Sequence, residues 1–315
     1  MKTYTLALCG LLWLALDLTA RAQAPERGGA PTNAARPAPT HANVAYGPHE
    51  RHVLDFWQAK SDRPAPLAVF IHGGGWVNGS KEILNAAPLR ELLEAGISVA
   101  ALNYRLLAHA PLPAAHQDAV RAVQFLRSKA TGWKLDPTRI GGFGGSAGAQ
   151  LVMYLAFHDD LADPRSADPI SRESTRLACV APNAAQMTLD FDWWVRHVPG
   201  YDQPHRDPRD LFAAKTKEEA LAESRKIAAL ELISKDDPPV FLSFAMAPGD
   251  PAPADAREAR NWKVHHVVHG VELKKLCDRL GVEAHLKYPG AQPRYNSTVE
   301  FFKAKLLAGS GAGGR

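Results

Sequence analysis

The chain has 315 residues, of which 46% are hydrophobic and 22% are charged, enough apolar content for one substantial core in one or two domains. The formal net charge of +4 comes from interspersed basic and acidic residues with no Lys/Arg block, so we expect no nucleic-acid-binding surface. Beyond the N-terminal segment, no apolar run approaches the ~20 residues that a membrane-spanning helix needs, so no stable membrane insertion is expected.

Residues 1–22 have the pattern of a secretory signal peptide. Lys2 supplies the positive start, residues 6–16 form an apolar core, and Ala20-Arg21-Ala22 forms a small-residue cleavage site. The apolar core is too short to span a bilayer, and cleavage is expected after Ala22, with Ala22-Gln23-Ala24 as a second option. The sequence therefore predicts an exported protein, secreted or periplasmic.

Residues 23–43 are rich in Ala, Pro, Gly and Arg without periodicity, which predicts a disordered linker. From residue 50 onward strand and helix patterns alternate, which is typical of an α/β domain with a mostly parallel sheet covered on both faces. We assign this domain to residues 44–308, followed by a flexible tail at 309–315. The predicted strands are 51–57, 66–72, 97–103, 139–144, 176–181, 239–245 and 282–288; the clearest predicted helices are 82–95, 113–130, 267–280 and 297–308.

The first motif is His72-Gly73-Gly74-Gly75-Trp76, directly after the apolar strand pattern of residues 66–71. Three consecutive glycines leave the backbone bare, so that amide N–H groups can approach a substrate oxygen closely. A phosphate-binding loop is the alternative, but such a loop needs a different glycine spacing and a helix directly after it. The motif therefore favours a loop that binds an oxyanion.

The second motif is Gly144-Gly145-Ser146-Ala147-Gly148, a G-x-S-x-G sequence. It lies between the strand pattern of residues 139–143 and a helix-like segment, residues 149–156. A strand, a sharp turn and a helix are the setting of a nucleophile elbow, which exposes the serine hydroxyl above the sheet. Ser146 is therefore the candidate nucleophile, and the N–H of Ala147 is a candidate oxyanion donor.

With both motifs the chain resembles the α/β-hydrolase superfamily, and within it the HGGGW-bearing esterases of the hormone-sensitive-lipase and feruloyl- or acetyl-xylan-esterase-like groups. The resemblance covers roughly residues 44–308. It implies that Gly74 and Gly75 supply the other oxyanion donors and that His72 braces the loop. Trp76 is a candidate substrate-binding residue, with simple packing of its ring as the alternative.

The same resemblance implies a cap over the active site, formed by an insertion before the seventh strand. Residues 182–236 interrupt the strand and helix alternation and fit this place. Trp193 and Trp194 lie within an apolar cluster there and are candidate substrate-binding residues. The alternative is that both rings only hold the insertion onto the sheet.

A serine hydroxyl needs a base, and the base needs an orienting group. The resemblance implies a carboxylate in the loop after the seventh strand, and residues 238–244 form the strand pattern for it. We choose Asp250 as the catalytic carboxylate, with Asp255 as the second candidate. A Gly-Asp-Pro turn is the structural alternative for Asp250.

The catalytic histidine of the family follows the eighth strand, but this chain has Tyr288-Pro289-Gly290-Ala291 and then Gln292 at that place. His265, His266 and His269 lie in another segment that would reach the same edge of the sheet. We choose His266 as the base, because a triad is defined by geometry and not by sequence position. His265 and His269 are spaced to chelate a metal on a helix, but no third ligand accompanies them, so no metal is expected.

The sequence thus predicts an exported serine hydrolase that cleaves small acyl or acetyl esters, with a small-molecule or carbohydrate ester as substrate and no cofactor. The alternative is a catalytically impaired binding protein of the same fold, because the usual histidine is missing. After removal of residues 1–22 two cysteines would remain, Cys179 and Cys277. Two buried free thiols are favoured over a disulfide for this pair.

Overall fold

A sheet of eight strands forms the centre of residues 35–308, the part of the chain that this computed structural model describes. The strands are β1 (His41–Ala45), β2 (Val53–Trp57), β3 (Ala65–Ile71), β4 (Ser98–Leu102), β5 (Leu135–Gly145), β6 (Cys179–Asn183), β7 (Val240–Ser243) and β8 (Ala284–Lys287). Their spatial order is β1-β2-β4-β3-β5-β6-β7-β8. The β1–β2 and β2–β4 pairs are antiparallel, whereas all pairs from β4 to β8 are parallel. The prediction of an α/β-hydrolase fold with a mostly parallel sheet is confirmed.

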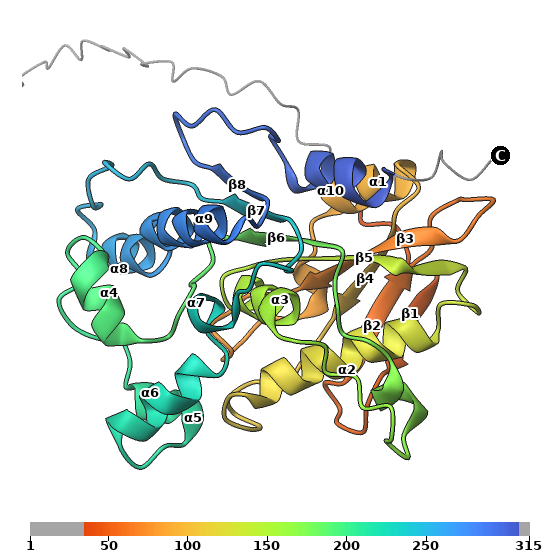
Figure 1. Ribbon diagram of the computed structural model, residues 1–315, viewed down its shortest axis with the longest axis horizontal. Coiled ribbons are helices and arrows are strands. Elements are labelled where there is room, and N and C mark those ends of the chain that lie inside the picture. The colour runs from red at the N-terminus through yellow and green to blue at the C-terminus, as the bar shows by residue number, and fades with distance from the viewer. Residues whose placement is uncertain (1–34, 309–315) are drawn as a thin grey trace, which may run out of the picture. The chain divides into compact units, whose positions relative to one another are not determined.

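Helices cover both faces of this sheet (Figure 1). They are α1 (Ala86–Glu94), α2 (Ala114–Ser128), α3 (Ala147–Phe157), α4 (Phe191–His197), α5 (Pro208–Phe212), α6 (Lys217–Arg225), α7 (Ala229–Leu232), α8 (Ala256–Val264), α9 (Val268–Leu280) and α10 (Thr298–Leu306), with short 3-10 helices at Lys81–Ile83 and Pro169–Arg172. α1 and α10 lie together on one face, and α2, α3 and α9 pack against the other. No helix of the described part has the length and apolar character needed to cross a membrane.

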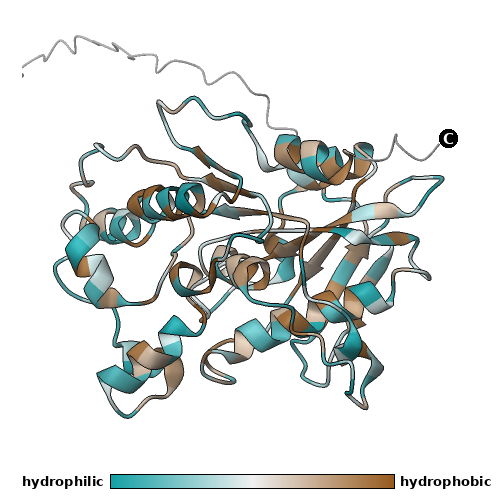
Figure 2. Ribbon diagram, viewed as in Figure 1, coloured by the Kyte–Doolittle hydropathy of each residue, from teal (hydrophilic) through white to brown (hydrophobic). Residues whose placement is uncertain are grey.

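The alternation of side chains along β3 explains why both faces need a cover. Leu67, Val69 and Ile71 belong to the core beneath α2 and α3, whereas Ala68 belongs to the core beneath α1 and α10. All four side chains are buried, because a parallel strand in the middle of such a sheet has no face in water. Figure 2 shows this hydrophobic character along the central strands, while the covering helices carry hydrophilic residues as well.

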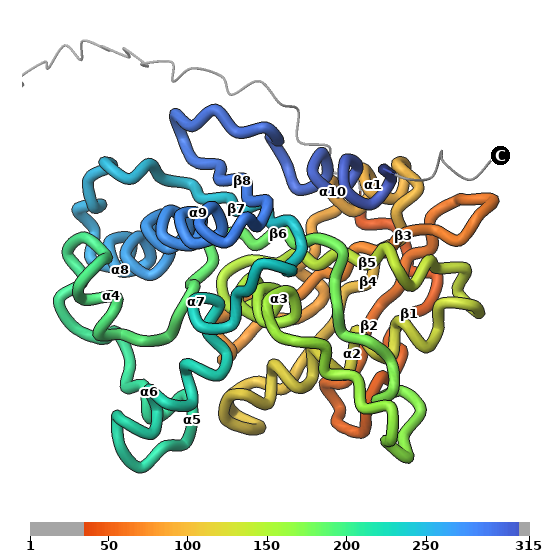
Figure 3. The backbone as a smooth tube through the Cα atoms, in the orientation of Figure 1, coloured from red at the N-terminus to blue at the C-terminus, as the bar shows by residue number. Residues whose placement is uncertain are grey.

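The chain leaves the sheet after β6 and returns at β7 after passing through α4, α5, α6 and α7 (Figure 3). This segment corresponds to the predicted cap insertion at residues 182–236. An apolar cluster holds it together, in which the rings of Phe191, Tyr201 and His205 contact that of Trp194. The insertion is therefore packed around its own aromatic residues beside the C-terminal ends of the parallel strands.

One prediction about the chain's organisation needs correction, and one helix was missed. β1 begins at His41 and pairs with β2, so residues 41–43 belong to the domain and not to the predicted linker. Helix α8 was not predicted at all. The predicted signal peptide, residues 1–22, and the predicted tail, residues 309–315, lie outside the described residues.

Cys179 and Cys277 are buried and unpaired, which confirms the prediction of two free thiols. Cys179 lies on β6 and Cys277 on α9. Burial raises the pKa of each thiol well above its usual range, so both remain protonated at neutral pH.

Candidate active site

Ser146 lies in a strained turn between β5 and α3. Its φ of 52° and ψ of −120° are values that a residue with a side chain rarely adopts, and such strain is held only where the surrounding structure enforces it. The N–H of Ser146 donates to the carbonyl of Asn183, at the end of the neighbouring strand β6. The predicted strand, sharp turn and helix around Ser146 are thus present in the structure.

The glycines on either side of Ser146 allow this turn to lie against β3. A side-chain carbon on Gly148 would lie 2.0 Å from the carbonyl oxygen of Ile71, and one on Gly144 would lie 2.3 Å from the same atom. Real contacts of this kind are never so short, so these positions require glycine. The G-x-S-x-G pattern therefore has a packing cause in addition to its chemical one.

His265 contacts the hydroxyl of Ser146. The Nε2 atom of His265 lies 2.9 Å from the Oγ atom of Ser146, which is hydrogen-bond distance. The Nδ1–H of the same ring donates to the backbone carbonyl of Asn261, at 2.9 Å. With its proton held on Nδ1, the neutral ring presents the lone pair of Nε2 to the serine hydroxyl.

Helix α8 positions this histidine. His265 is the residue that caps the C-terminus of α8, and Asn261 lies one turn earlier on the same helix. Burial lowers the pKa of His265, and the hydrogen bond to Asn261 opposes that change in part. The ring therefore stays neutral, and able to accept a proton, to a lower pH than an ordinary histidine.

The prediction that His266 faces Ser146 was wrong. His266 is buried against Trp262, and its Nδ1 atom accepts the N–H of Val268. His269 is buried as well, with its ring against Trp193 and Trp194. Successive residues at the end of a helix point in different directions, which is why only one of the three imidazoles reaches the serine.

Neither predicted carboxylate contacts His265. Asp250 is exposed, and its Oδ2 atom accepts the N–H of Ala247 within its own turn, the alternative foreseen for this residue. Asp255 caps the N-terminus of α8, where its Oδ1 atom accepts two backbone N–H groups. Among residues 35–308, the hydrogen bonds of the His265 ring are those to Ser146 and Asn261, so a backbone carbonyl takes the place of a carboxylate.

The glycine loop after β3 faces the elbow. Gly74 and Gly75 adopt φ values of 114° and 60°, which favour glycine. Within the described part of the chain, no acceptor receives the N–H groups of Gly74, Gly75 or Ala147. These three groups are the predicted oxyanion donors, and they remain available to a ligand.

His72 supports the loop from beneath, as expected. It is fully buried, its ring stacks on that of Tyr104 at 4.2 Å, and its Nδ1–H donates to the carbonyl of Gly73. The hydroxyl of Tyr104 donates to the carbonyl of His72. Burial lowers the pKa of His72 to about 4, so the ring is neutral and does not add a charge to the site.

Two cavities meet at Ser146. The outer cavity has a volume of about 550 Å³ and is lined by Gly73, Gly74, Ser146 and His265, among others. The inner cavity is narrower and lies between Ser146 and the cap, and its lining includes Trp76, Trp194 and Arg206. A cleft with one wide and one narrow arm can hold the two halves of a substrate on either side of the hydroxyl.

The three predicted substrate-binding tryptophans differ in their positions. Trp76 and Trp194 line the inner cavity, although both are buried and Trp194 also belongs to the core of the cap. Trp193 lines neither cavity and instead stacks on His197 at 4.3 Å. For Trp193 the alternative foreseen, that the ring only packs, describes the structure.

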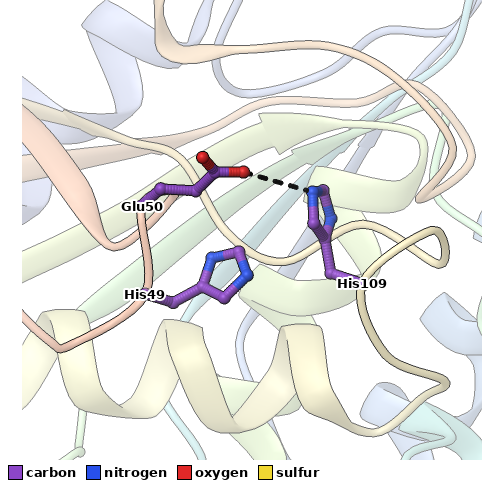
Figure 4. A group of neighbouring side chains, drawn as sticks. All are labelled: His49, Glu50 and His109. Atoms are coloured by element: carbon purple, nitrogen blue, oxygen red, sulfur yellow. Dashed lines mark ion pairs between the residues drawn. The ribbon is translucent and has the colours of Figure 1, made fainter.

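A separate group of His49, Glu50 and His109 has the composition of a metal site (Figure 4). Its potential ligand atoms lie within 4.8 Å of one another. However, the Nδ1 atoms of His49 and His109 both accept backbone N–H groups, which places the proton of each neutral ring on Nε2. A metal would need that atom unprotonated, so the ring orientations do not suit metal binding.

Sequence reasoning missed α8 and Arg206. A signal for α8 was present, because Asp255 is followed three residues later by Glu258, a pattern typical of a helix start. A helix begun at residue 256 would have ended near His265. No comparable signal pointed to Arg206, which reaches the site from the cap.

Comparison with known proteins places the chain in a family. The BD-FAE family model matches residues 54–247, more than half of the chain. The chain belongs to the BD-FAE family. The matched region includes the glycine loop and Ser146 and ends before His265.

Two curated relatives and a solved structure illustrate the similarity. Esterase LipC of Mycobacterium tuberculosis is 33% identical over 34% of this chain and 27% of its own length, and an ethyl acetate hydrolase of Pseudomonas putida is 28% identical over 54% and 55%. The chain thus spans about half or less of these relatives. A truncated carbohydrate esterase from gut microbiota is 20% identical, with a TM-score of 0.65 over 85% of this chain and 96% of that one, which shows the shared fold.

Proposed function

We propose that the protein is a serine hydrolase of carboxylic esters, with Ser146 as nucleophile and His265 as general base. The observation that carries the proposal is the 2.9 Å contact between Oγ of Ser146 and Nε2 of His265. The names of the relatives, an esterase and an ethyl acetate hydrolase, support the same class of reaction. The alternative of an impaired binding protein was based on a missing histidine, and an imidazole from another element stands at the serine.

The geometry suits an acyl-serine mechanism. Nε2 of His265 takes the proton of Ser146 as the oxygen attacks the ester carbonyl, and the negative charge develops on the carbonyl oxygen. The free N–H groups of Gly74, Gly75 and Ala147 would receive that charge, and each such donor is worth about 3 kcal/mol in other hydrolases. His265 then gives its proton to the departing alcohol, and water, activated by the same imidazole, releases the acid from the acyl-serine.

We further propose small acyl or acetyl esters as substrates, including esters of carbohydrates. The narrow inner cavity suits a short acyl group, and the wide outer cavity suits a larger alcohol such as a sugar. The carbohydrate esterase among the structural neighbours is in keeping with this assignment.

Hydrolysis of 4-nitrophenyl acetate tests the proposed roles. We expect Ser146→Ala and His265→Gln to lose at least about 10³-fold in kcat, because removal of either member of such a pair abolishes activation of the nucleophile. His266→Gln is the matched control and should keep its activity within about tenfold, with melting temperatures recorded for all variants. Labelling of Ser146 by a fluorophosphonate provides a second readout. Equal rates for the wild type and Ser146→Ala would refute the proposal.

Export is also a proposal, supported by the signal-peptide pattern of residues 1–22. N-terminal sequencing of protein recovered from the medium or periplasm of a bacterial host should start at Gln23. A full-length chain retained in the cytoplasm would contradict it.

A further inference from the structure

Arg206 brings a positive charge to the inner cavity beside Ser146. The residue lies just before α5, and the segment around it crosses from the cap to the glycine loop. Its Nη1 atom donates to the carbonyl of Gly75 at 3.2 Å, and its Nε atom donates to Nε2 of His205, also at 3.2 Å. A side-chain carbon on Gly75 would lie 3.1 Å from Nη2, so the guanidinium lies directly over the oxyanion loop.

No acidic residue balances this charge. Within residues 35–308, Arg206 forms no ion pair with a carboxylate. The two groups that accept hydrogen bonds from its guanidinium, the carbonyl of Gly75 and the ring of His205, are both uncharged. His205 is neutral, because burial and the neighbouring Arg206 lower its pKa to about 4. A half-buried guanidinium is costly unless it is paired, and arginine cannot lose its proton.

A second residue that lines this cavity carries a donor without a partner among the described residues. This residue is Trp76, which is only 4% exposed, and its indole N–H has no hydrogen-bond partner in the described structure. Two residues with hydrogen-bond donors, one of them charged, thus line a cavity that Ser146 also lines. This donor set suits an anion that accepts several hydrogen bonds, and a carboxylate pairs with a guanidinium in a well-defined geometry.

We propose that the inner cavity binds an acyl group that ends in a carboxylate, so that the preferred substrates are half-esters of short dicarboxylic acids. The ester carbonyl would lie at Ser146 and the distal carboxylate at Arg206. This inference rests on the proposed function, which supplies the reaction, and adds the substrate class. The inner cavity is narrow, which limits the acyl chain to a short one such as succinyl.

The catalytic test compares two methyl esters of equal shape. Monomethyl succinate carries the distal carboxylate, whereas methyl levulinate carries a methyl ketone in its place. We expect the wild type to prefer monomethyl succinate at least tenfold in kcat/KM, and we expect Arg206→Gln to abolish that preference, mainly through KM. Because Arg206 also contacts the oxyanion loop, the ratio between the two substrates is the readout, and losses common to both cancel.

Two variants control for charge. Arg206→Lys keeps the positive charge and should retain part of the preference. Arg225→Gln removes an exposed arginine from the same cap, on α6 and away from the lining of either cavity, and should leave the ratio at the wild-type value. A preference that survives in Arg206→Gln, or one that is absent in the wild type while methyl levulinate is hydrolysed, would overturn the inference.

A binding test separates this inference from the proposed function. Succinate, the acid product, should bind to Ser146→Ala in titration calorimetry, and the added Arg206→Gln substitution should weaken binding at least tenfold. This measurement needs no turnover, so it decides the inference even if no ester is hydrolysed. Absence of succinate binding, or binding that does not depend on Arg206, would refute the carboxylate site while leaving the roles of Ser146 and His265 to their own test.

Discussion

At the scale of single residues, the unusual feature is that a backbone carbonyl orients His265, the proposed base. In the common triad a carboxylate holds the imidazole in its tautomer and stabilises the imidazolium that forms. In this protein the carbonyl of Asn261 can do the first task, since it accepts the Nδ1–H of His265. Stabilisation of the imidazolium is left to the dipole of this neutral carbonyl. We therefore expect a lower kcat than that of an enzyme whose triad includes a carboxylate.

This arrangement predicts that Asp250 is dispensable. Its carboxylate accepts the N–H of Ala247, and an asparagine can keep that hydrogen bond. We expect Asp250→Asn to change kcat on 4-nitrophenyl acetate by less than about threefold, whereas loss of a true triad carboxylate costs about 10⁴-fold. A loss of 10³-fold or more in a folded Asp250→Asn variant would restore Asp250 as the catalytic acid.

At the scale of elements, α8 determines whether the base reaches the serine. Asp255 begins this helix by accepting two backbone N–H groups, and His265 ends it. Packing of the buried Trp262 holds α8 against the rest of the protein, and the N-cap at Asp255 satisfies two of the backbone N–H groups at its start. The position of the His265 imidazole therefore depends on α8 remaining folded.

Asp255→Ala should therefore reduce both stability and activity. Loss of an N-cap of this type costs about 1 kcal/mol, and fraying of α8 would let His265 leave Ser146. We expect a lower melting temperature and a several-fold lower kcat, measured with 4-nitrophenyl acetate. Asp255→Asn keeps an acceptor at the cap and should restore both quantities to near wild type. Equal effects of the two substitutions would instead indicate a role for the negative charge.

The sequence was sufficient to predict the parts of the site whose residues are contiguous in the chain. β5, Ser146 and α3 are contiguous, so glycine spacing and apolar runs were sufficient to predict the elbow. His265 lies 119 residues beyond Ser146, and which of three neighbouring histidines turns toward the serine depends on where α8 ends. The pairing of β1 with β2 was missed because β1 is an edge strand next to a segment rich in Ala, Pro and Gly, and it has little apolar pattern of its own.

At the scale of the whole molecule, buried histidines make the fold sensitive to acid. Burial lowers the pKa of His72 and His116 to about 4 and that of His269 to about 3. The same side chains titrate near 6.5 in the unfolded chain, so the unfolded state binds more protons as the pH falls below that value. Stability contributed by these neutral rings is present above pH 6.5 and is lost progressively as the pH falls from 6.5 to about 4 for His72 and His116, and to about 3 for His269.

We therefore expect the free energy of unfolding to fall steeply across this window, by up to roughly 1.4 kcal/mol per pH unit for each buried histidine with a lowered pKa, His205 included. Asp237, whose pKa burial raises, acts in the opposite sense and offsets a part of the slope. Urea unfolding at pH 7, 6 and 5 measures the effect. His269→Phe keeps an aromatic ring against Trp193 and Trp194 but removes one titrating group, so its slope should be smaller by up to roughly 1.4 kcal/mol per pH unit. A free energy that does not change between pH 7 and pH 5 would show that these imidazoles are protonated in the folded protein or reach solvent before it unfolds.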